Sequence, residues 1–364
     1  MTEPQTEPQA EALTEPQAEV QTEPPAELET EPLTEEDLLS VVGAYRLTAA
    51  VVAMTELSLP DHLASGPRTP EDLAAAAGVD PDLLGRLVRM LAAQGALLVD
   101  DQGRYANTGL SAALRVGPMR DMLLGWAALP GVVRAWSGLA SGIRSGRSPF
   151  EVVNRSSFHD YLVANPAEAA AYDRAMGSTS QGFEDLAKTL ELSGRETVVC
   201  VGGGNGMELG PLLDRYPGVR AILVDFPDTV PAAEAALAAL GIRDRVEIAP
   251  GDARRAVPPG DTYVMSTVLR CLDDESARDV LRSCRRSAAP GATLHAFEIP
   301  LPEGRPQYPA AMMDLTAWVA YGGKDRTVSR WRELFAETGW RLEDVVIVTE
   351  PYGMLSCTSA EPPA

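Results

Sequence analysis

The stretch Thr197-Val-Val-Cys-Val-Gly-Gly-Gly-Asn-Gly-Met-Glu-Leu209 decides the fold of this chain. Residues 197–201 have the composition of a buried strand, and the residues that follow Gly206 favour a helix. Glycines at 202, 204 and 206 form a G-x-G-x-G turn between the two. Because glycine has no Cβ, such a turn can bend sharply and let the backbone lie directly against a ligand. The stretch therefore predicts a cofactor loop at the carboxyl end of a strand.

Two classes of cofactor use a loop of this kind, and the glycine spacing helps to separate them. The dinucleotide fingerprint G-x-G-x-x-G needs glycine at 207 or 209, where this chain has Met207 and Leu209. A longer-spaced variant through Gly210 keeps nicotinamide binding open as the weaker alternative. The intact G-x-G-x-G suits S-adenosylmethionine, whose aminoacyl group lies against the loop.

Beyond Arg195, short β-branched runs alternate with helical stretches, which predicts a doubly wound α/β sheet over residues 191–360. Asp225 closes the second run, nineteen residues after Gly206, where a carboxylate can accept both ribose hydroxyls. Asp252 follows the third run, where a carboxylate can accept the adenine amino group. The loop and the two acids together predict a Rossmann-like cofactor domain. The expected strands are 197–201, 221–224, 246–248, 262–265, 293–299 and 345–348.

The segment 38–115 predicts three helices followed by a hairpin, which is the order of a winged helix. Residues 38–57 are apolar on all sides, as in a helix buried in a core or a subunit interface. Thr69 and Asp80 each precede a proline and an acidic first turn, which is typical of helix N-caps. Residues 95–105 then predict a strand, a turn and a second strand.

A winged helix suggests DNA binding, but the side chains do not favour it. The helix expected over 82–93 carries only Arg86 and Arg89 among leucine, valine and methionine, too few donors for base edges and phosphates. We therefore interpret 38–115 as a packing and dimerisation module, and expect a homodimer. Residues 116–190 predict further helices that link the two domains and line the substrate site.

The net charge of −21 lies unevenly along the 364 residues. Residues 1–37 repeat Thr-Glu-Pro with a period of eight and carry twelve acidic and no basic side chains, leaving −9 on the rest. Proline in every repeat forbids a continuous helix, so we expect a disordered acidic tail rather than a docking segment. The acidity argues against nucleic acid and anionic membranes as partners.

The remaining composition places the chain in the cytoplasm. We find no apolar run of the roughly 18 residues that a membrane span needs, and no secretory signal at the start. The four cysteines are far apart and form no C-x-x-C pair, which fits a reducing compartment. With only three histidines as well, no metal site is expected.

Taken together, these motifs resemble those of class I S-adenosylmethionine-dependent O-methyltransferases of the plant caffeate/acetylserotonin type, in their actinobacterial natural-product branch. The resemblance covers residues 40–357. It implies an aromatic or polyketide-like acceptor, and cofactor contacts at Gly202, Gly204, Gly206, Asp225, Asp252, Ala253 and Ser266. It also implies that Met176, Met313, Trp318 and Tyr321 line the acceptor pocket. The segments that carry the resemblance are Val201-Gly-Gly-Gly-Asn-Gly, Val224-Asp-Phe-Pro, Gly251-Asp, Asp273-Asp-Glu, Pro290-Gly-Ala and Gly322-Gly-Lys-Asp-Arg-Thr.

The chain departs from the family at the catalytic base. The family's segment Leu-His-Asp-Trp-Asp-Asp-Glu reads Leu269-Arg-Cys-Leu-Asp-Asp-Glu275 here, so arginine stands where the histidine base belongs. Arginine stays protonated in proteins and cannot accept the hydroxyl proton. The two acids that orient the histidine in the family survive as Glu298 and Asp325. We expect Glu298 to form a buried ion pair with Arg270.

The sequence is compatible with three functions. The enzyme methylates a phenol that ionises unaided, or an amine, largely by proximity. Alternatively, it keeps the cofactor but transfers no methyl, and Arg270 and the sulfonium stabilise an oxyanion in a hydroxylation, decarboxylation or pericyclic reaction. In the third function, the chain is a catalytically inactive partner in a dimer. Release of S-adenosylhomocysteine separates the first from the others.

Overall fold

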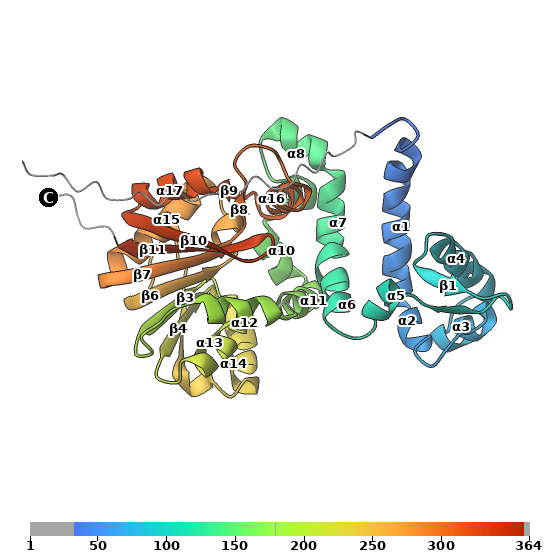
Figure 1. Ribbon diagram of the computed structural model, residues 1–364, viewed down its shortest axis with the longest axis horizontal. Coiled ribbons are helices and arrows are strands. Elements are labelled where there is room, and N and C mark those ends of the chain that lie inside the picture. The colour runs from blue at the N-terminus through green and yellow to red at the C-terminus, as the bar shows by residue number, and fades with distance from the viewer. Residues whose placement is uncertain (1–32, 179, 360–364) are drawn as a thin grey trace, which may run out of the picture. The chain divides into compact units, whose positions relative to one another are not determined.

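The computed structural model describes residues 33–178 and 180–359 (Figure 1). Two compact units are present, one ending at Arg46 and the other beginning at Leu47. The predicted acidic tail lies outside the described residues except for residues 33–37.

Helix α1 (Leu38–Glu56) corrects the expectation that no stretch of this sequence is long and apolar enough for a membrane span. It has 19 residues and a mean hydropathy of 1.6, so by length and composition alone it is apolar enough to cross a membrane. Only Met54 and Thr55 are buried along it, and Leu39 and Tyr45 are 83% and 74% exposed. Met54, near its end, belongs to the apolar core of the module that follows.

The winged-helix order is confirmed in the module that follows. Helices α2 (Leu59–His62), α3 (Pro70–Ala77) and α4 (Pro81–Ala93) precede an antiparallel hairpin of β1 (Leu97–Val99) and β2 (Tyr105–Asn107). Both predicted N-caps form, because Thr69 Oγ1 accepts the Asp72 amide and Asp80 Oδ1 accepts the Leu83 amide. Leucines and valines of all three helices and the hairpin close one apolar core.

Residues 116–190 contain the further helices that the sequence predicts, and one helix, α5 (Gly109–Ala113), precedes them. A π-helical segment, η1 (Leu123–Ala127), interrupts the series. The α-helices are α5 (Gly109–Ala113), α6 (Pro118–Met122), α7 (Pro130–Ser137), α8 (Leu139–Ser145), α9 (Pro149–Asn154), α10 (Phe158–Ala164), α11 (Pro166–Gly177) and α12 (Ser180–Thr189).

The C-terminal domain contains a seven-stranded sheet in the order β10-β11-β7-β6-β3-β4-β5. The pairs among β7, β6, β3, β4 and β5 are parallel, and β11 is antiparallel to both of its neighbours. The sequence missed β11, because its glycine, serines and cysteine give no β-branched run. The strands are β3 (Thr197–Val201), β4 (Arg220–Asp225), β5 (Val246–Pro250), β6 (Gly260–Ser266), β7 (Ala288–Glu298), β10 (Trp340–Thr349) and β11 (Tyr352–Ser359), with a short pair β8 (Pro300–Leu301) and β9 (Arg326–Thr327).

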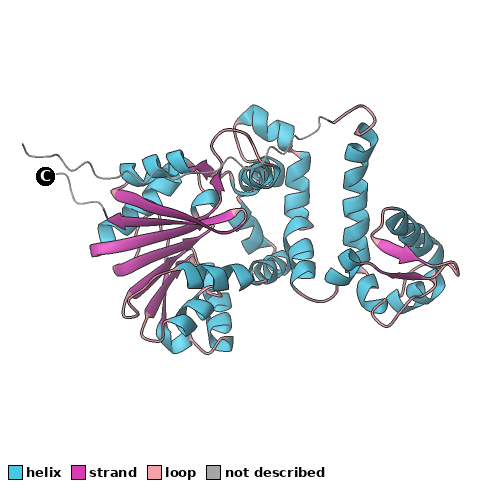
Figure 2. Cartoon of the chain, viewed as in Figure 1, coloured by secondary structure: helices cyan, strands magenta, loops and turns pink. Residues whose placement is uncertain are grey.

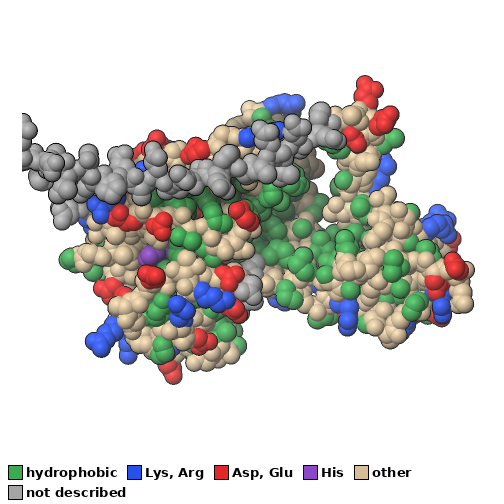
Figure 3. All heavy atoms as spheres, viewed as in Figure 1, with side chains coloured by type: hydrophobic (Ala, Val, Ile, Leu, Met, Phe, Trp, Pro, Cys, Tyr) green, Lys and Arg blue, Asp and Glu red, His purple; other side chains and the backbone are tan. Residues whose placement is uncertain are grey.

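Helices cover both faces of this sheet, so the doubly wound prediction is confirmed (Figures 1 and 2). Alternate residues of each strand point to opposite faces. Val198 and Cys200 pack with α12, α13 (Leu209–Arg215) and α14 (Val230–Ala239). Val199 and Val201 pack with α15 (Asp274–Ser287) and α17 (Val328–Glu337). On the face seen in Figure 3, the acidic and basic side chains of the described residues are interspersed.

The site is positioned by the carboxyl ends of the parallel strands, which meet at one edge of the sheet. Neighbouring strands β3, β4, β6 and β7 end at Val201, Asp225, Ser266 and Glu298. In an open α/β sheet this edge is where ligands bind. Helix α16 (Tyr308–Tyr321) and the loop after it, residues 322–325, contact the turn that follows β6.

Candidate active site

The glycine loop after β3 has the geometry that its sequence requires. Gly202, Gly204 and Gly206 have φ angles of +69°, +55° and +77°, in the left-handed region that disfavours other residues. A Cβ at Gly202 would lie 2.7 Å from Cγ2 of Val268, on the turn after β6. Valine is stiff at χ1 and cannot move aside cheaply. The loop therefore reaches its position only with glycine.

Asp225 at the end of β4 supports this loop. Its Oδ2 accepts the Gly204 amide and its Oδ1 accepts the Phe226 amide, both at 2.7 Å. Burial raises the pKa of Asp225, and the two amide hydrogen bonds act in the opposite direction. Carboxylate oxygens have further lone pairs, so Asp225 can hold the loop and still accept ribose hydroxyls.

The other residues expected at the cofactor lie along the same edge. Asp252 follows β5, but its carboxylate pairs with Arg254, with Nη2 2.8 Å from Oδ2 and Nε 2.9 Å from Oδ1. Hydrogen bonding from Arg254 lowers the pKa of Asp252. Ala253 packs against the sheet core, and Ser266 ends β6 directly before the turn. The sequence did not indicate that Arg254 engages this carboxylate.

The turn after β6 carries Arg270 into the protein interior. Its guanidinium binds Asp325 at two points, Nε to Oδ1 at 2.8 Å and Nη2 to Oδ2 at 2.7 Å. Nη2 also donates to the Met313 carbonyl of α16 at 2.8 Å. Nη1 has no hydrogen bond within the residues that the structure describes. Burial favours a lower pKa for Arg270, but the hydrogen bonds and charge of Asp325 outweigh it, so Arg270 stays charged.

The expected ion pair between Arg270 and Glu298 is wrong. Glu298 is fully buried, and its Oε1 and Oε2 accept the backbone amides of Leu269 and Arg270 at 2.7 and 3.3 Å. Glu298 ends β7, beside the end of β6, so its short side chain meets the backbone of the turn. The longer arginine side chain extends past it to Asp325. Burial raises the pKa of Glu298 to about 8, although the positive charge of Arg270 acts to lower it.

Aromatic side chains gather next to this turn. Tyr172 of α11 and Tyr321 of α16 place their hydroxyl oxygens 3.2 Å apart. Trp126 stacks on Tyr321 with ring centroids 5.8 Å apart, and Phe158 meets both tyrosines edge-on. Burial raises the pKa of both tyrosines, so both hydroxyls stay protonated and can donate. Sequence reasoning expected Tyr321 but missed Tyr172, because nothing local links positions 149 residues apart.

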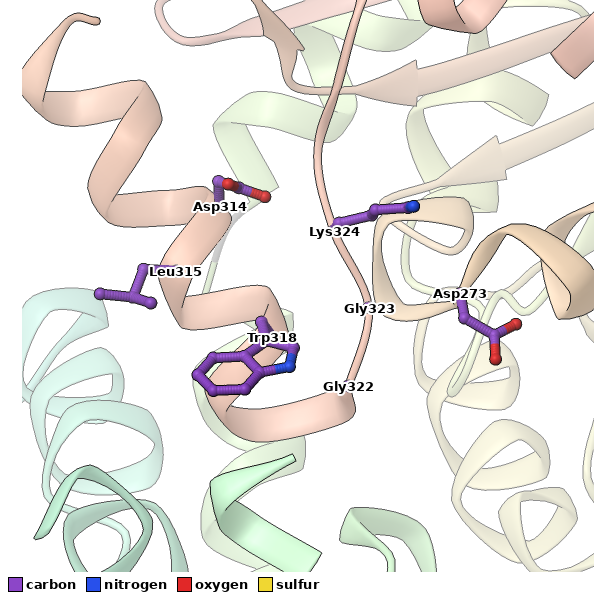
Figure 4. A pocket seen from close by; sticks show the side chains of 7 residues that line it. All are labelled: Asp273, Asp314, Leu315, Trp318, Gly322, Gly323 and Lys324. Carbon is purple, nitrogen blue, oxygen red and sulfur yellow. The ribbon is translucent and has the colours of Figure 1, made fainter. Parts of the chain in front are cut away.

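The other residues expected at the acceptor lie in different places. Met176 is on α11, whose end lies against the glycine loop, since a Cβ at Gly177 would be 4.0 Å from Nδ2 of Asn205. Met313 contributes its carbonyl to Arg270. Trp318 faces a cavity of about 420 Å³ between α16 and residues 322–324 (Figure 4). The lining of this cavity comprises Asp273, Asp314, Leu315, Trp318, Gly322, Gly323 and Lys324.

Comparison with known proteins agrees with this geometry. Residues 136–341 match the model of the O-methyltransferase domain, and residues 39–117 match that of the O-methyltransferase dimerisation domain. The mitomycin biosynthesis 6-O-methyltransferase of Streptomyces lavendulae is 34% identical over 317 residues, covering 85% of this chain and 89% of the relative.

Solved structures give the same result. The mitomycin 7-O-methyltransferase superposes with a TM-score of 0.85 at 31% identity, over 90% of this chain and 98% of the other. The neocarzinostatin O-methyltransferase, solved with S-adenosylmethionine and 2-hydroxy-5-methyl naphthoic acid, has a TM-score of 0.76 at 28% identity, over 86% and 95%. The cofactor loop, Asp225 and the paired domains all fit an S-adenosylmethionine enzyme with a dimerisation module.

Proposed function

This chain belongs to the S-adenosylmethionine-dependent O-methyltransferase family, and on that basis we propose that it methylates an aromatic hydroxyl that is already ionised when it binds. The observation that carries the proposal is the Arg270–Asp325 pair, which fixes a guanidinium donor where the family's base would lie. Arg270 would hold the oxyanion rather than remove its proton.

The cofactor is S-adenosylmethionine, which supplies an electrophilic methyl group on a sulfonium. The backbone of Gly202, Gly204 and Gly206, which carries no Cβ atoms, would hold the aminoacyl end of the cofactor. Asp225 would accept the ribose hydroxyls, while Asp252, Ala253 and Ser266 would surround the nucleoside. Because Arg254 already engages Asp252, the adenine amino group would share that carboxylate with a guanidinium.

Three groups at the acceptor side have hydrogen-bond donors suited to an oxygen anion. Nη1 of Arg270 carries two N–H donors that no described residue accepts. Tyr172 and Tyr321 share one hydrogen bond between two hydroxyls, so the pair has one proton left to donate. Charge-assisted donors bind an oxyanion more strongly than a neutral hydroxyl. The site therefore favours the phenolate form of the acceptor over the phenol.

The acceptor that fits is flat and aromatic. Trp126, Phe158 and the two tyrosines offer ring faces and edges beside Arg270. The relatives above are named for mitomycin and neocarzinostatin biosynthesis, and one was solved with a naphthoic acid. We propose an aromatic or polyketide-like secondary metabolite of an antibiotic pathway as substrate. A neutral aromatic amine is the second acceptor class, since it also needs no base to expose its lone pair.

The alternative in which the fold keeps its cofactor but transfers no methyl is not favoured, because the relatives are methyltransferases by name. Residues 39–117 belong to a dimerisation domain, so the enzyme is a homodimer. We place it in the cytoplasm on the strength of its four free cysteines, three of them buried.

The test measures S-adenosylhomocysteine released with a series of aromatic hydroxyls of increasing pKa. If the acceptor must ionise unaided, kcat/KM at pH 7 falls by up to about tenfold for each unit of acceptor pKa above 7, following the ionised fraction. Arg270→His should flatten this dependence and favour the weakly acidic phenols. Arg270→Lys is the matched control, since it keeps a charge but loses the bidentate pairing with Asp325.

Turnover without S-adenosylhomocysteine would rule out methyl transfer. A kcat/KM that is independent of acceptor pKa in the wild-type enzyme would show that another group removes the proton.

A further inference from the structure

The turn between Ser266 and Arg270 contains an unusual backbone conformation. Thr267 has a φ of +56°, in the left-handed region. A β-branched residue is a genuine outlier there, because its Cβ substituents crowd the neighbouring carbonyl. Such a conformation persists only where its surroundings enforce it, and it is concentrated at functional sites.

Among the described residues, two other non-glycine residues share this region, and both lie at the end of a helix. Arg155, with a φ of +57°, is the C-cap of α9, a position where left-handed backbone is common. Ser58, with a φ of +54°, lies at the start of α2. Thr267 ends no helix and begins none, so helix capping does not account for it.

Contacts on both sides hold Thr267 in place. Its amide donates to the Phe297 carbonyl of β7 at 2.8 Å, and its own carbonyl accepts the Cys271 thiol at 3.2 Å. Glu298 fixes the amides of Leu269 and Arg270, two and three residues further along the turn. The chain therefore leaves the sheet at Thr267 and is clamped again within two residues.

This change of direction places one residue of the turn beside the cofactor loop and another beside the acceptor. Val268, the next residue, lies against the glycine loop, so tightly that Gly202 has no room for a Cβ. The side chain of Arg270 then extends toward the acceptor side of the site, where its guanidinium forms an ion pair with Asp325. We propose that Thr267 is a positioning residue, whose strained backbone sets the spacing between the cofactor loop and the Arg270 guanidinium. This inference rests on the proposed function.

Thr267→Gly tests the proposal because it separates stability from activity. Glycine adopts the same φ without strain, so the melting temperature should rise by about 2–4 °C. Glycine also reaches other conformations as easily, so the turn should lose its fixed spacing. We expect kcat to fall at least tenfold, and the affinity for S-adenosylhomocysteine to fall about fivefold, because near-attack geometry tolerates little displacement. A purely structural role predicts that stability and activity move together.

Two further variants make the result specific. Arg155→Gly is the matched control, since it relieves the same φ at an exposed position outside the site. It should raise the melting temperature similarly and leave kcat unchanged. Thr267→Asn keeps a Cβ and tolerates the left-handed region, so it should retain more activity than Thr267→Gly.

The proposal is overturned if Thr267→Gly is more stable with unchanged kcat and cofactor affinity, or if it is less stable than the wild-type enzyme. Failure of the proposed function looks different, because the wild-type enzyme would then release no S-adenosylhomocysteine with any acceptor. Even in that case, the affinity for S-adenosylhomocysteine in Thr267→Gly and Arg155→Gly would still test the spacing of the turn.

Discussion

Two turns meet at the carboxyl edge of the sheet, the glycine loop of residues 202–206 and the β6 turn of residues 267–271. The glycine loop reaches its left-handed conformations with glycine at three positions. The β6 turn reaches one with threonine, and is held by Glu298 from β7 and by Asp325 from the loop after α16. The first presents bare backbone, whereas the second presents a charged side chain.

The difference follows from what each turn must hold. A cofactor that lies against the backbone needs positions without side chains. Glycine provides these positions, and the local sequence alone specifies it. An acceptor oxygen needs a donor at a fixed point, and fixing a long arginine side chain takes partners from distant parts of the chain. The four predictions below test this division, beginning with the largest expected effect.

Arg270→Leu should destabilise the fold most. It leaves Asp325 buried without its partner, and breaking a buried ion pair in this way costs about 3–5 kcal/mol. The free energy of unfolding in urea measures the loss. The double variant Arg270→Leu/Asp325→Leu removes both charges and should recover most of that stability. If the single and double variants are equally stable, the pair does not hold the turn.

Gly202→Ala should damage cofactor binding with a smaller effect on the fold. Alanine would be strained at a φ of +69°, and its Cβ would meet Val268 at 2.7 Å. We expect the affinity for S-adenosylhomocysteine to fall about 100-fold, which is about 2.7 kcal/mol. Isothermal titration measures it directly.

Gly103→Ala is the control for backbone strain alone. Gly103 has a φ of +73° in the turn between β1 and β2, with open space where the Cβ would be. The Gly103→Ala variant should be about 1 kcal/mol less stable than the wild-type enzyme, and its affinity for the cofactor should be unchanged. Equal affinity losses in Gly202→Ala and Gly103→Ala would mean that contact with the β6 turn is irrelevant.

A pH titration separates loss of fold from loss of chemistry. Burial lowers the pKa of His295, on β7, from 6.5 to about 4. Between these values the unfolded chain binds a proton at this site that the folded chain does not, so the contribution of His295 to stability falls as the pH falls through this window. The expected loss is about 2 kcal/mol, reduced from the full shift because the side chain is partly exposed.

His295→Asn should remove this contribution, measured as the difference between its unfolding midpoints and those of the wild-type enzyme from pH 7 to pH 4. The difference isolates His295, because Glu298, whose raised pKa acts in the opposite direction, is present in both proteins. Asparagine stays neutral and places its amide where Nδ1 of His295 lies, 3.0 Å from the Ser356 hydroxyl. With an acceptor that is ionised throughout, kcat of this variant should stay level over the same range. A decline in kcat with a stable fold would reveal a base that the reaction needs.

The same division explains how much the sequence predicts. The glycine loop, Asp225 and the alternation of strands and helices are local patterns, so the doubly wound domain and the cofactor edge follow from them. The partner of Arg270 does not, because Glu298 and Asp325 are both distant carboxylates and only the fold decides which one meets the guanidinium. Strand β11 was missed for a related reason, since its place between β10 and β7 makes up for weak β propensity.

The smallest expected effects are on the acceptor side, at the tyrosine pair. Tyr172→Phe and Tyr321→Phe each remove one hydroxyl from a hydrogen bond of 3.2 Å. Each should lower kcat/KM about fivefold, which corresponds to about 1 kcal/mol, the net value of one hydrogen bond. The double variant should lose less than the product of the two, because both hydroxyls act as one donor unit. The affinity for S-adenosylhomocysteine should not change in any of the three. If it falls together with kcat/KM, the tyrosines support the cofactor as well, and the two sides of the site are not separate.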